Sequence, residues 1–254
     1  MEISIVAEPL FHLGGFVVTN SLFWAFLVSG IGFLVVVSFL RPERFRDVPT
    51  GFQNGVEAVF EGLFSFMEGI VGDRELTKRF FPLVATIFLF VLFSNWSGLL
   101  PGAGTVTTPG VHNGHEMIIP LLRSPSADLN MTAAIAIVAM CAVQFFGVAA
   151  LGLRGYGSKF FIAPWKKPYV IGTAVGLLEL IGEFAKILSF SFRLFGNVFA
   201  GEVLLLVMLN LMPYIVPLPF LVLEVFVGVV QAGVFSLLTL VFLKMATEAH
   251  EEAH

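Results

Sequence analysis

An apolar stretch of forty residues, 171–210, carries more charge than a membrane helix normally tolerates. It is long enough to cross a bilayer and contains no proline. A charged side chain at the centre of a membrane helix costs at least about 2.5–3.5 kcal/mol, so it needs a partner or a function there. The fold must therefore bring partners to the polar side chains of this stretch, which include Glu179, Glu183, Lys186, Arg193, Asn197 and Glu202.

The composition of the whole chain agrees with a membrane location. Of its 254 residues, 57% are hydrophobic and only 13% are charged, a balance unlike that of a soluble domain. The net charge of −4 gives no electrostatic reason to expect nucleic-acid binding. A single cysteine, Cys141, excludes a disulfide within the chain. We therefore predict an all-α integral membrane protein that forms one membrane domain over residues 1–254.

Six segments are predicted to be helical, and two of them are too long for a simple crossing. Forty residues of helix measure about 60 Å, roughly twice the hydrocarbon thickness, so we expect the two long helices to tilt steeply or kink. Asp128 is placed to cap the third span. The predicted elements are a first span at 16–40, an amphipathic helix at 51–72, a second span at 80–100, a third span at 127–153, and long tilted helices at 171–210 and 214–246.

Basic residues alternate from one connection to the next. The connection at 41–79 holds six Lys or Arg residues and the one at 151–170 holds four, whereas the loop at 101–127 holds only Arg123. Lys and Arg concentrate on the cytoplasmic side of membrane proteins. The pattern predicts an N-terminus outside and a C-terminus in the cytoplasm.

Arg193 presents a fixed positive charge on one face of the fourth predicted span. An arginine does not deprotonate in a protein, so this side chain needs an anion or strong acceptors. Glu202 lies nine residues on, which places it about 180° around the helix and about 14 Å further along the axis. We infer that the counter-anion comes from another helix, and that helix can belong to another chain. The polar residues that share or flank the Arg193 face are Lys186, Glu179, Asn197 and Glu183, and the small residues beside them are Gly182, Ala185, Ser189, Gly196 and Ala200.

The last predicted helix repeats this polar theme. Glu224 and Gln231 are seven residues apart and share a face. If the two long helices run antiparallel, Glu202 can meet Glu224 at one depth and Arg193 can meet Gln231 at another. Toward the cytoplasm, Glu179 and Glu183 would form a further acidic layer.

These motifs together resemble subunit a of the F-type ATP synthase. The resemblance is carried by FRLFGNVFAGE at 192–202, by VGVVQAGVFSLLTLVFL at 227–243, by SPSADLN at 124–130, and by TGFQNGVEAVFEGL at 50–63. One position departs from the best-known bacterial pattern: the site seven residues before Gln231 is often histidine, and here it is Glu224. Because both residue types are ionisable, we expect the role to persist.

The resemblance implies a mechanism, partners and a location. Arg193 would face a rotating c-ring and force its carboxylate to release a proton. Partners would be the c-ring, b-type peripheral stalk subunits, the F1 sector indirectly and the lipid bilayer of a bacterial inner membrane. Such a subunit has no catalytic site of its own, and we expect no cofactor and no metal. The implied proton-translocation residues are Arg193, Asn197 and Gln231, with Glu202, Glu224 and Asp128 in an outer half-channel, Glu179 in an inner one, and Glu183 and Lys186 as candidates there.

Other functions and roles remain open at this point. A secondary ion transporter with its own substrate site would predict an internal repeat, and an intramembrane hydrolase would need a nucleophile and a base at depth. Glu183 can equally be a packing partner, and Lys186 can extend to the membrane surface. Two metal-like patterns occur, H-E-x-x-H at 250–254 and a His/Glu group at 112–116, which we interpret as solvated segments.

Overall fold

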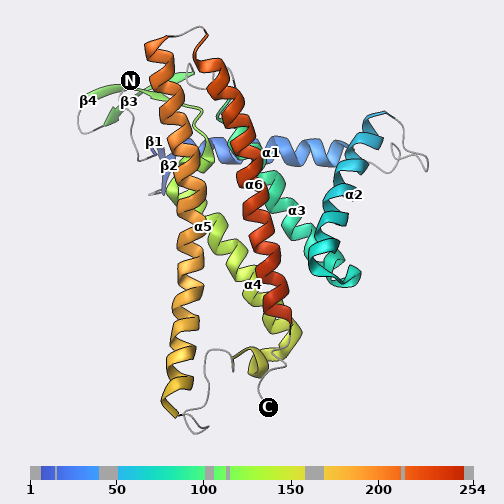
Figure 1. Cartoon of the computed structure of the whole chain (residues 1–254). Helices are drawn as coiled ribbons and strands as arrows, with labels where there is room; N and C mark the ends of the chain where they lie inside the picture. Colours follow the sequence, from blue (N-terminus) through green and yellow to red (C-terminus); the bar gives the residue numbers. More distant parts are fainter. Residues whose placement is uncertain are drawn as a thin grey trace.

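The computed structural model describes residues 7–14, 16–39, 51–100, 106–112, 115–157, 169–212 and 215–248. Most of these residues are helical, which confirms the predicted all-α class (Figure 1). The helices are α1 (Asn20–Phe39), α2 (Phe52–Val71), α3 (Arg74–Ser97), α4 (Leu129–Gly157), α5 (Tyr169–Leu211) and α6 (Pro217–Thr247), with a short 3-10 turn, η2 (Pro125–Ala127).

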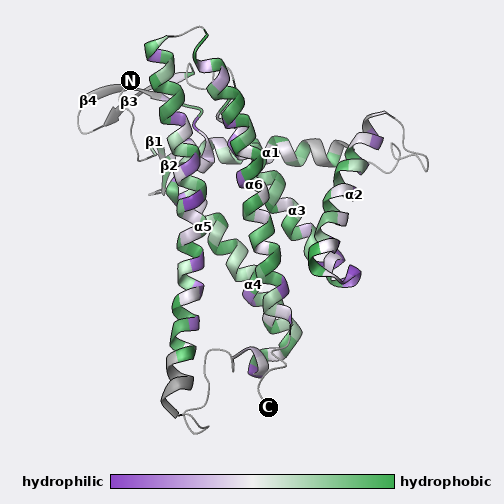
Figure 2. Cartoon of the chain, in the orientation of Figure 1, coloured by the Kyte–Doolittle hydropathy of each residue, from purple (hydrophilic) through white to green (hydrophobic). Residues whose placement is uncertain are grey.

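Four of the described helices are long and apolar enough to cross a membrane: α3, α4, α5 and α6. Figure 2 shows mostly hydrophobic residues along all four helices, interrupted by hydrophilic residues on α5. In Figure 1, α1 runs horizontally, whereas α5 and α6 run between the top and the bottom of the view. The chain is thus a multi-pass membrane protein, and the predicted crossing by the first span remains a prediction.

The two longest helices match their predicted segments closely. α5 has 43 residues and α6 has 31. Pro217 stands in the first turn of α6, where a proline needs no backbone hydrogen bond and its fixed φ suits a helix. Figure 1 shows the chain reversing between the two helices, so that they run in opposite directions. Their tilt relative to the bilayer remains a prediction.

The core lies where α3, α4, α5 and α6 meet. Val91, Ala136, Leu194 and Ala232 are almost completely buried there. The rings of Phe190 on α5 and Phe235 on α6 meet edge to face, with centroids 4.7 Å apart. The small alanines let the helices approach closely, and the aromatic pair fixes α5 against α6.

Two short hairpins stand outside this bundle and were not predicted. β1 (Pro9–Leu13) pairs with β2 (Phe16–Thr19), and β3 (Thr107–His112) pairs with β4 (His115–Pro120), both antiparallel. Residues 16–19, which the sequence analysis placed in the first span, therefore form β2, and α1 begins at Asn20. Gly14 adopts a φ of 54°, which favours glycine, and it allows the chain to turn between β1 and β2.

α4 begins and ends with distinct local features. The Asn130 N–H donates to Asp128 Oδ1 over 2.9 Å, which confirms the predicted cap. Near the other end, Gly152 has φ 75° and ψ 159°, values that interrupt the helix. The chain then folds back so that the Tyr156 ring covers Gly147, where a Cβ atom would collide with the ring.

Candidate functional site

Glu202 on α5 and Glu224 on α6 line one small pocket, here called the acidic pocket. Glu224 lies directly against Gly201, where an added Cβ would overlap its carboxyl group. Glycine at this position therefore creates the space that Glu224 occupies beside Glu202. The lining residues are Asn95, Gly98, Leu99, Ser124, Val198, Glu202, Glu224, Val227 and Gly228.

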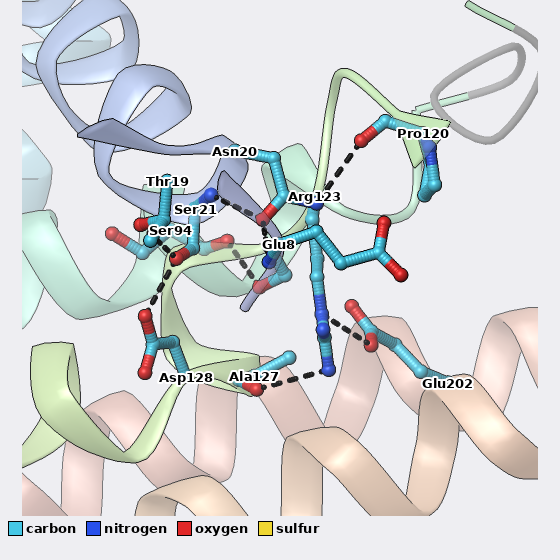
Figure 3. A network of polar contacts seen from close by, with 11 residues as sticks. Glu8, Thr19, Asn20, Ser21, Ser94, Pro120, Arg123, Ala127, Asp128 and Glu202 are labelled. Carbon is cyan, nitrogen blue, oxygen red and sulfur yellow. Dashed lines mark hydrogen bonds and ion pairs between the residues drawn. The ribbon is translucent and has the colours of Figure 1, made fainter. Parts of the chain in front are cut away.

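A half-buried arginine approaches the acidic pocket from the segment before η2. Arg123 Nε lies 3.8 Å from Glu202 Oε2, and the two side chains are only 10% and 26% exposed (Figure 3). The guanidinium also donates to the Ala127 carbonyl at 3.4 Å. From the sequence, Arg123 entered only the prediction of membrane orientation. Its isolation as the single basic residue of the 101–127 loop was the signal that could have identified it.

Two side chains at the end of α3 fix α6 beside the acidic pocket. Asn95 Nδ2 donates to the Gly228 carbonyl at 3.1 Å, and Trp96 Nε1 donates to the Val225 carbonyl at 3.1 Å. A Cβ at Gly228 would lie 3.1 Å from the Trp96 ring, so glycine permits this close approach. Asn95 Oδ1 is buried and has no partner among the described atoms. Sequence reasoning missed both residues, because neither is charged.

Arg193 and Gln231 line a second small pocket, here called the arginine pocket. The remaining lining residues are Phe190, Leu194, Phe235 and Leu238, which are apolar. Arg193 is exposed, and its closest described polar contact is a 3.4 Å hydrogen bond to Ser189 Oγ. No carboxylate forms an ion pair with Arg193 within the part of the chain that the structure describes. The cation thus lies on an outer face of the protein.

Glu183 and Lys186 form a closed polar network between α4 and α5. Lys186 Nζ lies 2.8 Å from Glu183 Oε1, and Gln144 Nε2 donates to Glu183 Oε2 at 2.9 Å. The Tyr156 hydroxyl donates in turn to Gln144 Oε1 at 2.5 Å. Lys186 Nζ also lies 4.7 Å from the centroid of the Phe242 ring. Glu183 is 8% exposed, and both of its oxygens accept a hydrogen bond.

The remaining predicted site residues lie apart from these groups. Asp128 accepts a 2.6 Å hydrogen bond from Ser21 Oγ and caps α4, and it is not among the residues of the acidic pocket. Figure 3 shows it turned away from Glu202. Asn197 is exposed one turn after Arg193, and Glu179 is half-buried further back on α5.

The structure gives no support for a metal site at either of the two metal-like patterns. Residues 250–254 lie outside the described residues. His112 and His115 face each other across the β3–β4 turn as backbone partners. Among the described residues, no group of three His, Cys, Asp or Glu side chains could hold a metal ion.

Comparison with known proteins gives a consistent family. The family model described as ATP synthase A chain matches residues 22–244. The ATP synthase subunit a of Moorella thermoacetica is 33% identical over 95% of this chain and 96% of its own length. The subunit a of Campylobacter fetus is 32% identical over 99% of both chains, and that of Gloeobacter violaceus is 34% identical over 87% of this chain and 81% of its own length. The chain therefore belongs to the ATP synthase subunit a family, as a multi-pass membrane subunit of the proton-translocating Fo sector.

Proposed function

We propose that this chain carries protons along two offset paths, one on each side of Arg193, and couples their passage to rotation of a ring of c subunits. The outer path ends at the acidic pocket, and the inner path begins near Glu179. The observation that supports this most strongly is the separation of the two pockets. The acids are gathered in one pocket, and an exposed arginine without a carboxylate partner among the described residues lies in the other.

Arg193 is the proposed barrier and coupling group. A guanidinium stays charged in any protein environment, so it repels a proton that would pass directly between the two paths. Its exposure at membrane depth requires an anion from outside this chain. A carboxylate on each c subunit would meet this requirement as it passes. Gln231, in the same pocket, and Asn197, one turn away, are placed to bond with that carboxylate or with Arg193.

The acidic pocket is the proposed end of the outer path. Glu202 and Glu224 are two ionisable groups in one pocket, and Arg123 supplies a nearby positive charge. A site of this kind can hold a proton between two carboxylates and release it. Glu202 lies about 14 Å along α5 from Arg193, so a proton needs a further carrier to move from one level to the other. We assign that role to water between the acidic pocket and the c-subunit carboxylate beside Arg193. Asp128, bonded to Ser21 and to the start of α4, is assigned here to holding the outer segment in place.

Glu179 is the proposed residue of the inner path. Glu183 and Lys186 balance each other's charge inside the α4–α5 network, so they are better suited to forming the wall of that path. With the inner path on the cytoplasmic side of a bacterial inner membrane, the N-terminus lies outside and the C-terminus lies in the cytoplasm. A b-type peripheral stalk would hold the chain still against the rotating ring.

The experiment that tests this function replaces Arg193 by alanine in the complete synthase. ATP synthesis is measured in vesicles under an imposed proton gradient, and co-purification reports assembly. We expect an assembled complex that makes no ATP and that leaks protons passively, because the electrostatic barrier is gone. Near-normal synthesis by the assembled Arg193→Ala complex would contradict the proposal.

A further inference from the structure

Glu8, just before β1, carries a buried carboxyl group outside the four long apolar helices. The residue is 9% exposed, and its Oε2 atom has no hydrogen-bond partner among the described residues. Because a buried carboxyl oxygen without a partner lowers stability, the side chain calls for an explanation beyond packing.

The backbone of Glu8, and not its side chain, anchors this segment. The Glu8 N–H donates to Asn20 Oδ1 at 3.2 Å, and the Asn20 N–H donates to the Glu8 carbonyl at 3.0 Å. Asn20 Nδ2 then donates to the Pro120 carbonyl at 3.0 Å, which connects the first hairpin to the end of β4. Since any residue except proline could form these backbone bonds at position 8, the fold does not require a carboxyl group there.

The Glu8 side chain extends from this anchor on the side of the Arg123–Glu202 pair. Figure 3 shows its carboxyl group directed to the side of the cluster where Arg123 and Glu202 pair. The other charged group drawn there, Asp128, is turned away and accepts the Ser21 hydroxyl. Glu224 reaches the same pocket from α6. In the view of Figure 3, a carboxyl group with an unpartnered oxygen is thus directed toward the Arg123–Glu202 pair, and Glu202 belongs to the proposed end of the outer path.

We propose that Glu8 is a proton relay on the outer side of this path, an inference that rests on the proposed function. A protonated Glu8 carboxyl group gives its proton, through water, to the ionised carboxylate of Glu202. Glu8 is left as a carboxylate and takes a new proton from the outside solution. Arg123 lies beside Glu202 and balances the negative charge of the Glu202 carboxylate until the proton arrives.

Glu8→Gln in the complete synthase tests this role, because it keeps the shape and the backbone bonds but removes the proton carrier. ATP synthesis is driven by a fixed membrane potential while the outside pH is varied. We expect an assembled complex whose synthesis falls several-fold at alkaline outside pH and recovers as the outside is acidified, since abundant protons then reach Glu202 without a relay. Glu8→Asp should retain most activity. Glu75→Gln, at an exposed carboxylate on α3, is the matched control and should behave as the parent.

Three outcomes would overturn the inference. One is a parental rate for Glu8→Gln at every outside pH. Another is a deficit that does not change with outside pH, and the third is loss of assembly, because each of these assigns the side chain a structural role or none. Arg193→Ala, measured beside these variants, distinguishes failure of the Glu8 relay from failure of the proposed function. If it still abolishes synthesis, only the relay is wrong, whereas normal synthesis by that variant removes the proposed function itself.

Discussion

Two arginines of this chain have opposite surroundings. Arg123 is 10% exposed and pairs with Glu202, whereas Arg193 is exposed and has no carboxylate partner among the described residues. A partly buried pair is satisfied within the chain, so Arg123 is suited to setting the charge and position of one acid. An exposed cation at membrane depth is satisfied only by something that arrives from outside. Under the proposed function, the comparison distinguishes an arginine that positions a carboxylate of its own chain from one that acts on a carboxylate of another subunit.

The largest expected difference is in the response of the two arginines to lysine. Arg193→Lys should reduce synthesis by more than about tenfold, because a lysine can lose its proton when desolvated and lacks the planar fork of arginine. Arg123→Lys should reduce synthesis far less, since the partner of Arg123, Glu202, belongs to the same chain and can adjust to a lysine. Synthesis rates in vesicles, normalised to assembled complex, provide the comparison. Equal losses in the two variants would remove the distinction.

The acidic pocket predicts coupling between its two acids. Glu202→Gln and Glu224→Gln should each lower synthesis, and their combined effect should differ from the sum of the single effects. Contacting groups show interaction energies of about 0.5–3 kcal/mol in double-mutant cycles. The cycle is measured on the rate of proton-driven synthesis. Strict additivity would argue that the two carboxyl groups act independently.

Gly201→Ala is expected to lower ATP synthesis less than the Glu202 and Glu224 substitutions do. The new methyl group would occupy the position of the Glu224 carboxyl group, so Glu224 must move away from Glu202. Synthesis should fall several-fold while assembly is retained. Gly62→Ala in α2 is the control, because a Cβ there meets nothing within 4 Å in the structure. Parental activity in both variants would show that the position of Glu224 is unimportant.

The smallest expected effect belongs to the Glu183 network. Tyr156→Phe removes the hydrogen bond to Gln144 and should lower stability by about 0.5–1.5 kcal/mol. Synthesis should change less than twofold, because the network forms a wall and carries no proton in this account. Thermal inactivation of the purified complex measures the first effect. A large loss of synthesis without loss of stability would instead place the network in the inner path.

The helices were predictable from the sequence because their signals are local. Long apolar runs predicted α3 to α6, and antiparallel spacing predicted that Glu202 would lie near Glu224 and Arg193 near Gln231. The Asp128 cap also followed from one residue type at a helix start.

The missed features depend on contacts between segments far apart in the chain. Arg123 meets Glu202 across 79 positions, and Asn95 meets Gly228 across 133. The first hairpin was missed because its short strands continue into an apolar helix without a change in composition. The sequence identified the carboxylates but not the arginine, amide and indole groups that hold them and their helices in place.

The central claim is that the Arg193 face of α5 meets a ring of c subunits, and cross-linking tests it most directly. In a variant with Cys141 replaced by serine, Asn197→Cys lies exposed one turn from Arg193, and Phe145→Cys lies on α4 with 70% exposure. Each is paired with cysteines placed around the membrane carboxylate of the c subunit. We predict disulfide formation in the assembled complex from position 197 and none from position 145. Cross-linking from position 145 alone would contradict the account.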